Sequence, residues 1–145
     1  MLSTENKEEI YKICIESIQN YSSNDKLNKI CEILFNSFDE WIFCGFYRRD
    51  GSQLHVEQYK SVKIPCSPIT MNGVCGKAIS KNMILNVPDV NEFPGHIVCD
   101  KDSKSEICIP IKYNNCSYVL DVDSNKFDGF DNVDVKYLSK ILKMT

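Results

Sequence analysis

Residues 41–59 read WIFCGFYRRDGSQLHVEQY. Trp41 to Tyr47 is a continuous run of apolar and aromatic residues, which is typical of a central strand. Apolar and polar residues alternate from Leu54 to Tyr59, which is typical of a second strand. Asp50-Gly51, between the two segments, is a favoured hairpin turn. This stretch therefore predicts an antiparallel hairpin.

The two ends of the chain have helical spacing instead. Apolar residues recur every three or four positions in three segments, at residues 4–21, 27–38 and 131–143. We assign Ile13 and Cys14 to the apolar stripe of the first helix and Cys31 to that of the second. Three amphipathic helices are therefore expected to pack on the sheet.

A second hairpin is predicted nearer the C-terminus. Glu106 to Tyr113 and Tyr118 to Asp123 are strand-like segments joined by Asn114-Asn115, and Met83 to Val87 adds a short strand. Helices at both ends around an antiparallel sheet make an α+β fold. With 145 residues, the chain is expected to form one domain, residues 1–145, that buries a core without cross-links.

The composition narrows the class of protein. The chain is 43% hydrophobic and 26% charged, which is typical of a soluble globular domain. A net charge of −3 with dispersed basic residues argues against a nucleic-acid surface. We find no signal segment and no run of membrane-spanning length, so the eight cysteines are expected to be thiols in a reducing cytoplasm rather than a disulfide framework.

Residues 88–105 form a long predicted loop that carries Cys99. Loops of this length are uncommon in compact domains and are usually functional or disordered. Polar neighbours suit a cysteine with a stabilised thiolate, but they do not exclude a buried one. By contrast, Cys108 lies between Ile107 and Ile109 and fits a packing thiol. For Cys99, the reactive and buried alternatives both stay open on the residues alone.

Two further cysteines lie in loop-like sequence. Cys66 stands between two prolines, at an edge or loop where a thiol is accessible. Cys75 begins a short helix in GVCG, residues 73–76, where the helix dipole could stabilise its thiolate or the glycines could simply allow close packing. The interval from Cys66 to Cys75 is nine residues and that from Cys75 to Cys99 is twenty-four. These spacings support a conventional zinc site poorly and favour thiol redox chemistry.

Acidic residues end the last predicted strand. Asp121 and Asp123 are two residues apart, so they project from one face of the strand while Val122 points to the other. Glu106 opens the strand expected to pair with this one, so three carboxyl groups could converge. Such a cluster keeps at least one proton near neutral pH, and it can bind an ammonium and donate a proton to an oxygen. The alternative is a solvated strand end.

Five segments carry a family resemblance: GFY at residues 45–47, GVCG at 73–76, VPDVNEFPGHIVCD at 87–100, SEI at 105–107 and LDVDS at 120–124. In this order they resemble the free methionine-R-sulfoxide reductases, which are single GAF domains. The resemblance implies a GAF-like antiparallel sheet flanked by N-terminal and C-terminal helices. It also implies the reduction of free L-methionine-R-sulfoxide to methionine through a cysteine sulfenic acid and a disulfide.

The resemblance assigns roles by position. It implies that Cys99 is the catalytic cysteine, Cys66 the usual resolving cysteine and Cys75 a third cysteine of the site. The substrate is held by carboxylates and an aromatic wall, which correspond to Glu106, Asp121, Asp123 and Phe43. The family has a tryptophan at the position of Phe43, whereas here the tryptophan is Trp41.

The resemblance further implies a thioredoxin-type reductant, a homodimer, and no metal or organic cofactor. A rival interpretation from another class is a non-catalytic GAF module that binds a small molecule or senses oxidants. Both predict a pocket over the sheet, so turnover distinguishes them.

Overall fold

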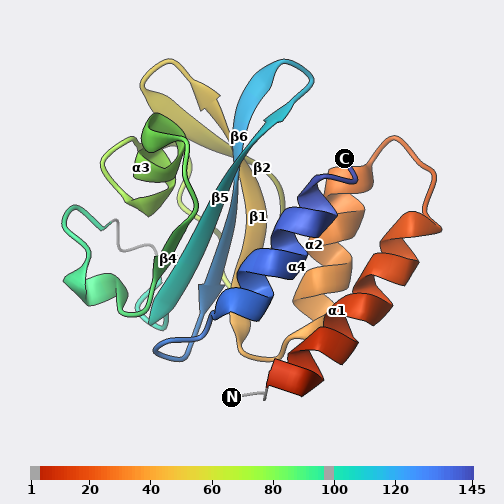
Figure 1. Ribbon diagram of the computed structural model, residues 1–145. Coiled ribbons are helices and arrows are strands. Elements are labelled where there is room, and N and C mark those ends of the chain that lie inside the picture. Colours follow the sequence, from red (N-terminus) through yellow and green to blue (C-terminus); the bar gives the residue numbers. More distant parts are fainter. Residues whose placement is uncertain (1–3, 97–99) are drawn as a thin grey trace.

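A computed structural model describes residues 4–96 and 100–145 of the chain. Six strands form one antiparallel sheet in the order β3-β2-β1-β6-β5-β4, with helices on both faces (Figure 1). The strands are β1 (Trp41–Asp50), β2 (Gln53–Ser61), β3 (Ile69–Thr70), β4 (Leu85–Val87), β5 (Ser105–Tyr113) and β6 (Cys116–Ser124). The helices are α1 (Thr4–Gln19), α2 (Lys26–Ser37), α3 (Val74–Lys81) and α4 (Asn132–Leu142), with a 3₁₀ turn η1 (Val90–Glu92). The α+β prediction is confirmed.

Both predicted hairpins are present. Asp50 pairs with Gln53 across the β1–β2 turn, and Tyr113 pairs with Cys116 across the β5–β6 turn. In the second turn Asn114 and Asn115 have φ values of 49° and 64°, the left-handed conformation that a two-residue hairpin turn of this type requires. Strands β1 and β6 pair in the middle of the sheet, so the two hairpins join there.

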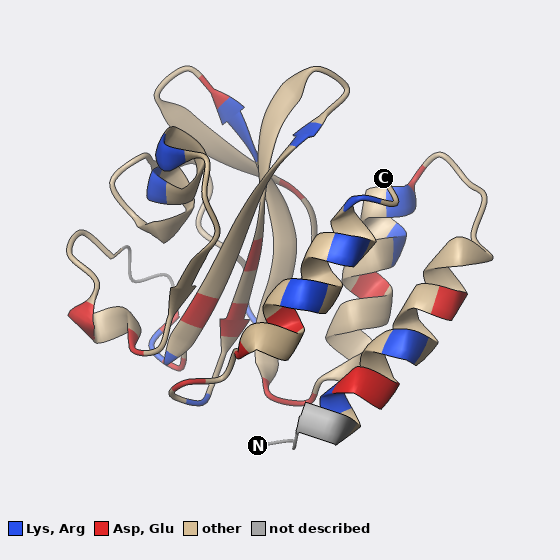
Figure 2. Cartoon of the chain, in the orientation of Figure 1, with Lys and Arg blue, Asp and Glu red and all other residues tan. Residues whose placement is uncertain are grey.

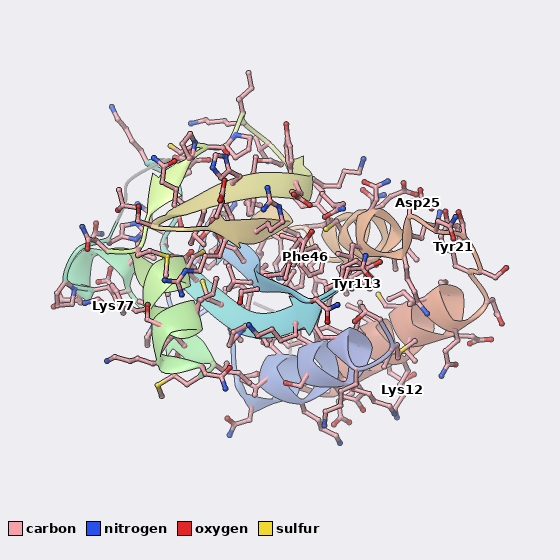
Figure 3. The ribbon with its side chains drawn as sticks, turned by 90° about the horizontal axis from the view of Figure 1, so that it is seen from above. Lys12, Tyr21, Asp25, Phe46, Lys77 and Tyr113 are labelled. Carbon is pink, nitrogen blue, oxygen red and sulfur yellow. The ribbon has the colours of Figure 1, made fainter. Side chains whose placement is uncertain are left out.

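Helices α1, α2 and α4 cover one face of the sheet, while α3 lies on the other (Figures 1 and 3). The larger core lies under the three helices and includes the fully buried Phe46, Leu120 and Ile141. None of the helices in the described part of the chain is long and apolar enough to cross a membrane.

The prediction that Ile13 belongs to the buried stripe of α1 is wrong, because its side chain is 64% exposed. The buried apolar residues of α1 are Tyr11, Cys14, Ile15 and Ile18. At 3.6 residues per turn, Ile13 stands roughly 200° around the helix from Tyr11, on the solvent side.

A buried ion pair joins the N-terminal and C-terminal helices. Lys7 Nζ lies 2.6 Å from Asp134 Oδ2 and donates to the backbone oxygen of Gly129 at 3.2 Å. The Tyr11 hydroxyl donates to Asp134 Oδ1 at 2.5 Å. Asp134 also belongs to the capping box that starts α4 with Asp131. One carboxylate therefore fixes both α1 and the start of α4.

The opposite face has a smaller core beneath α3, β4 and the segment that precedes β5. Phe43, Val74, Ala78 and Val119 are among its buried members. Helix α3 approaches its preceding loop closely at Gly76, where an added Cβ would lie 2.2 Å from the backbone oxygen of Met71. Close packing therefore accounts for this glycine of the GVCG segment.

Candidate active site

A pocket opens on the sheet face that carries α3. Its lining includes Phe43, Tyr47, Cys75, Glu106, Asp121 and Asp123 from the sheet and α3, with Lys63, Pro65, His96, Asp100 and Ser103 from the loops. The pocket thus lies where β1, β5 and β6 run side by side.

The register of β5 and β6 brings the three carboxyl groups together. Glu106 pairs with Asp123, and Asp121 pairs with Cys108 two positions along. Figure 2 shows acidic positions in red on the neighbouring strands β5 and β6, where Glu106 and Asp123 pair near one end of both strands. Glu106 and Asp121 are 6% and 5% exposed, so the alternative of a solvated strand end is wrong for these two residues.

Burial changes how the carboxyl groups titrate. It raises the pKa of Glu106 well above its ordinary value, and the charges of Asp121 and Asp123 raise it further. Burial also raises the pKa of Asp121, but hydrogen bonds from Glu106 and Cys108 oppose that rise. Asp121 is therefore the more readily ionised carboxyl of the pair, and Glu106 is the one that more readily keeps its proton. Such a pair can donate a proton and hold a cation at the same time.

Two thiols border the carboxyl groups. Cys75 Sγ lies 3.4 Å from Cys108 Sγ, and Cys108 Sγ lies 3.5 Å from both Glu106 Oε2 and Asp121 Oδ1. The hydrogen bond with Cys108 lowers the pKa of the Cys75 thiol, but burial and the nearby aspartates raise it to about 12. Stabilisation of the Cys75 thiolate by the start of α3 is therefore outweighed, and the thiol stays protonated.

The prediction that Cys108 is only a packing thiol is incomplete. The residue is fully buried, but its thiol faces the pocket carboxyl groups rather than the core under the three helices. The flanking isoleucines suggested a thiol in the apolar core and gave no sign of its contact with the carboxyl groups. The available signal was its spacing, because a residue two positions from Glu106 in a strand shares its face.

The loop segments on either side of residues 97–99 also line the pocket. His96 Nδ1 lies 3.8 Å from Glu106 Oε1, and burial lowers the pKa of His96, which favours the neutral imidazole. Asp100 accepts from Lys63 Nζ at 3.2 Å, and Ser103 Oγ donates to Asp123 at 3.4 Å. Cys99, the predicted nucleophile, lies outside the described residues.

The remaining predicted site residues do not all lie at the pocket. Phe43 lines the pocket, whereas Trp41 stacks on Phe38 at 4.4 Å on the opposite face, so the aromatic wall is Phe43. Cys66 is half-buried, and its backbone oxygen accepts from the Tyr47 hydroxyl at 2.9 Å. Among the described lining residues its neighbour Pro65 is present and Cys66 is not.

Comparison with known proteins identifies the family of the chain. No family model matches the chain. A Saccharomyces cerevisiae protein named free methionine-R-sulfoxide reductase is 35% identical, over 96% of this chain and 85% of the yeast protein. The chain belongs to the free methionine-R-sulfoxide reductase family. The predicted resemblance is thereby confirmed.

Other comparisons agree with this membership and define the fold of the reductase family. The crystal structure of the Neisseria meningitidis free methionine-R-sulfoxide reductase in complex with its substrate matches with a TM-score of 0.84 and 28% identity, covering 99% of this chain and 89% of that one. A Dictyostelium discoideum protein named GAF domain-containing protein A is 39% identical over 99% of this chain and 94% of its own length. The predicted GAF fold is confirmed.

Proposed function

We propose that this chain is an oxidoreductase that reduces free L-methionine-R-sulfoxide to methionine. The observation that carries the proposal is the buried pair of Glu106 and Asp121, in a pocket whose rim includes His96 and Asp100 on either side of Cys99. A free amino acid sulfoxide has an ammonium group and a sulfoxide oxygen. An ionised and a protonated carboxyl side by side complement both groups.

The charges assign the substrate contacts. Asp121, whose ionised form accepts hydrogen bonds from its neighbours, binds the ammonium. Glu106 carries a proton and donates it to the sulfoxide oxygen. Asp123 pairs with Glu106 across the strands and accepts a hydrogen bond from Ser103. Burial and the charge of Asp121 raise the pKa of Asp123 well above its ordinary value, so its carboxyl is a second group beside Glu106 that can carry the proton. Phe43 packs against the apolar part of the substrate.

Cys99 performs the chemical step. Its thiolate attacks the substrate sulfur and forms a sulfur–sulfur bond, and Glu106 protonates the sulfoxide oxygen. The resulting hydroxyl then moves from the substrate sulfur to the Cys99 sulfur as the sulfur–sulfur bond breaks, which leaves Cys99 as a sulfenic acid and releases methionine. Asp100, the next residue in the sequence, lines the pocket. The step consumes two electrons from the thiol and requires no metal or organic cofactor.

Cys66 then resolves the sulfenic acid. Its thiol condenses with the Cys99 sulfenic acid to form a disulfide and water, and a thioredoxin-type dithiol reduces that disulfide by exchange. Two observations favour Cys66 over Cys75. Cys66 is partly accessible in a loop next to the lining residue Pro65, whereas Cys75 is buried and its pKa of about 12 keeps it protonated.

The remaining parts of the proposal concern the setting of the enzyme. We place it in a reducing cytoplasm, where its many cysteines stay reduced and a thioredoxin-type partner is present. We also propose a homodimer, as the family resemblance implies. Light scattering of the reduced protein tests this, and a monomeric mass at assay concentrations would contradict it.

Turnover tests the main proposal. The reduced protein and its Cys99→Ser variant are incubated with separate R and S sulfoxides of free methionine and dithiothreitol, and methionine is measured by chromatography. We expect methionine from the R form alone and none with Cys99→Ser. Cys116→Ser is the matched control, because Cys116 lies beside the β5–β6 turn. No product from the unmodified protein would favour a non-catalytic GAF module.

Peptide mapping tests the resolving step. After one round of substrate without reductant, mass spectrometry should find Cys66 linked to Cys99. A Cys66→Ser variant should still release one equivalent of methionine but lose turnover with thioredoxin. A linkage of Cys75 to Cys99 would reassign the resolving role.

A further inference from the structure

We propose that Cys75, Glu106, Cys108 and Asp121 form a binding site for a thiophilic divalent cation such as Zn²⁺, and that this cation excludes substrate from the pocket. The second part rests on the proposed function, whereas the first does not. The site uses Cys108, which has no part in the proposed reduction.

The distances between the ligand atoms suit a tetrahedral cation. Each of the four residues offers one ligand atom, and these atoms all lie within 4.8 Å of one another. The four thiol contacts among them measure 3.4, 3.5, 3.5 and 4.0 Å. Zinc bonds of about 2.3 Å to sulfur and 2.0–2.2 Å to oxygen give tetrahedral edges of about 3.4–3.8 Å. The four thiol contacts differ from these edges by up to roughly 0.4 Å, and the remaining two pairs, which lie within 4.8 Å, differ by up to about 1.4 Å, so small side-chain movements would complete the coordination.

Rigid elements hold the four ligands. Glu106 and Cys108 are two residues apart on one face of β5, and Asp121 pairs directly with Cys108 from β6. Cys75 comes from the first turn of α3, which the close approach at Gly76 holds against its neighbouring loop. All four side chains are buried. Because Cys75, Glu106 and Asp121 also line the open pocket, a cation has a path from solvent.

The donor set selects the kind of cation. Two sulfur and two carboxylate ligands suit zinc and similar borderline metals, whereas Mg²⁺ and Ca²⁺ prefer six or more oxygen ligands. Binding releases the thiol protons of Cys75 and Cys108 and the carboxyl proton of Glu106 to solvent, and it forms two metal–thiolate and two metal–carboxylate bonds with no change in oxidation state. The cation compensates the charges that Glu106 and Asp121 carry once both are ionised.

Occupation by the cation and binding of substrate are mutually exclusive. Asp121 and Glu106 are the groups proposed to hold the ammonium and the sulfoxide oxygen. A metal that takes one oxygen from each removes both contacts, so zinc acts as a competitive inhibitor that a chelator reverses.

Cobalt titration tests the site without reference to activity. Co²⁺ is added anaerobically to chelator-treated protein kept reduced with a phosphine, and the near-ultraviolet thiolate-to-cobalt band and the visible tetrahedral bands are recorded. We expect saturation at one equivalent and displacement by Zn²⁺. Cys75→Ser and Cys108→Ser should each weaken binding about 100-fold or more, because loss of a direct ligand exceeds the 10–100-fold cost of losing an outer-shell partner. Cys116→Ser should bind as the unmodified protein does.

Controls keep the outcomes separate. Cys108→Val provides a second variant if the serine variant unfolds, and thermal melting identifies the folded protein. A thiolate band that survives in both Cys108 variants but disappears in Cys66→Ser would overturn the proposed site. Added free methionine-R-sulfoxide should raise the cobalt concentration needed for half saturation. If cobalt binds through Cys75 and Cys108 and substrate has no effect, the metal site stands and the substrate roles of Glu106 and Asp121 fall.

Discussion

Replacement of Asp121 by asparagine tests how the enzyme recognises a free amino acid. The change keeps the shape of the side chain and removes its charge. Two unit charges 4 Å apart attract by about 4 kcal/mol at the effective dielectric constant of a protein site. After desolvation, truncating one partner of a buried charge pair costs about 2–5 kcal/mol. Asp121 is 5% exposed, so a loss of about 3 kcal/mol is expected, which lowers kcat/KM by roughly 100-fold.

The assay compares initial rates with dithiothreitol at fixed pH for the unmodified protein, Asp121→Asn and a matched variant. Asp128→Asn is that control, because Asp128 is exposed and its φ of 51° is a conformation that asparagine also adopts. It removes the same charge from the protein as a whole. Thermal melting checks that both variants remain folded.

N-acetylated methionine-R-sulfoxide completes the test, because it lacks the ammonium. The unmodified enzyme should strongly prefer the free substrate, and Asp121→Asn should lose most of that preference. If Asp121→Asn slows the reaction no more than Asp128→Asn does, or if the preference survives the substitution, Asp121 does not bind the ammonium.

Three further predictions concern the pH dependence and stability of the fold. Glu106 must be protonated to donate, so the rate of the unmodified enzyme should fall as pH rises through the raised pKa of Glu106. The Glu106→Gln variant should be slower and should lack this alkaline decline. A variant with the same pH–rate profile as the unmodified enzyme would rule out the donor role. Asp134→Ala removes the nearer ion-pair partner of the buried Lys7, leaving Asp131 at 3.5 Å, and should cost about 3 kcal/mol in urea unfolding, whereas the exposed Glu9→Gln should cost almost nothing; equal midpoints would contradict a stabilising role for the ion pair. Gly76→Ala should lower the melting temperature far more than Gly51→Ala, which is strained at φ 62° but meets no atom within 4 Å; the reverse order would refute close packing of α3.

Much of this architecture follows from local pattern. The period of two in β6 predicted that Asp121 and Asp123 share a face, and the pairing of β5 with β6 brings Glu106 to the same place. The hairpin turns and the three long helices also follow from residue type and spacing. These features depend on neighbours in sequence, which is why they could be predicted.

The features that local pattern does not predict depend on contacts between distant elements. Trp41 and Phe43 are two apart, so a regular strand would place both on one face, but the β1–β6 register shifts between them and Trp41 turns to the helix-covered side. Cys108 meets Cys75 only because α3 packs on β5, and no local pattern specifies that packing. The burial of Lys7 likewise depends on an acidic partner at the far end of the chain.

The β5–β6 hairpin has a consequence for how this family of sequences can vary in length. The two-residue turn sets the register of both strands. The number of residues between Asn115 and the acidic residues of β6 therefore decides which residues of β5 they face. One residue inserted between that turn and Asp121 would rotate the aspartates into the helix-covered core and bring Leu120 and Val122 to the pocket. Two inserted residues would restore the faces but place Asp121 opposite Glu106 and move Asp123 beyond the start of β5. Length changes compatible with this pocket are therefore confined to the turn itself.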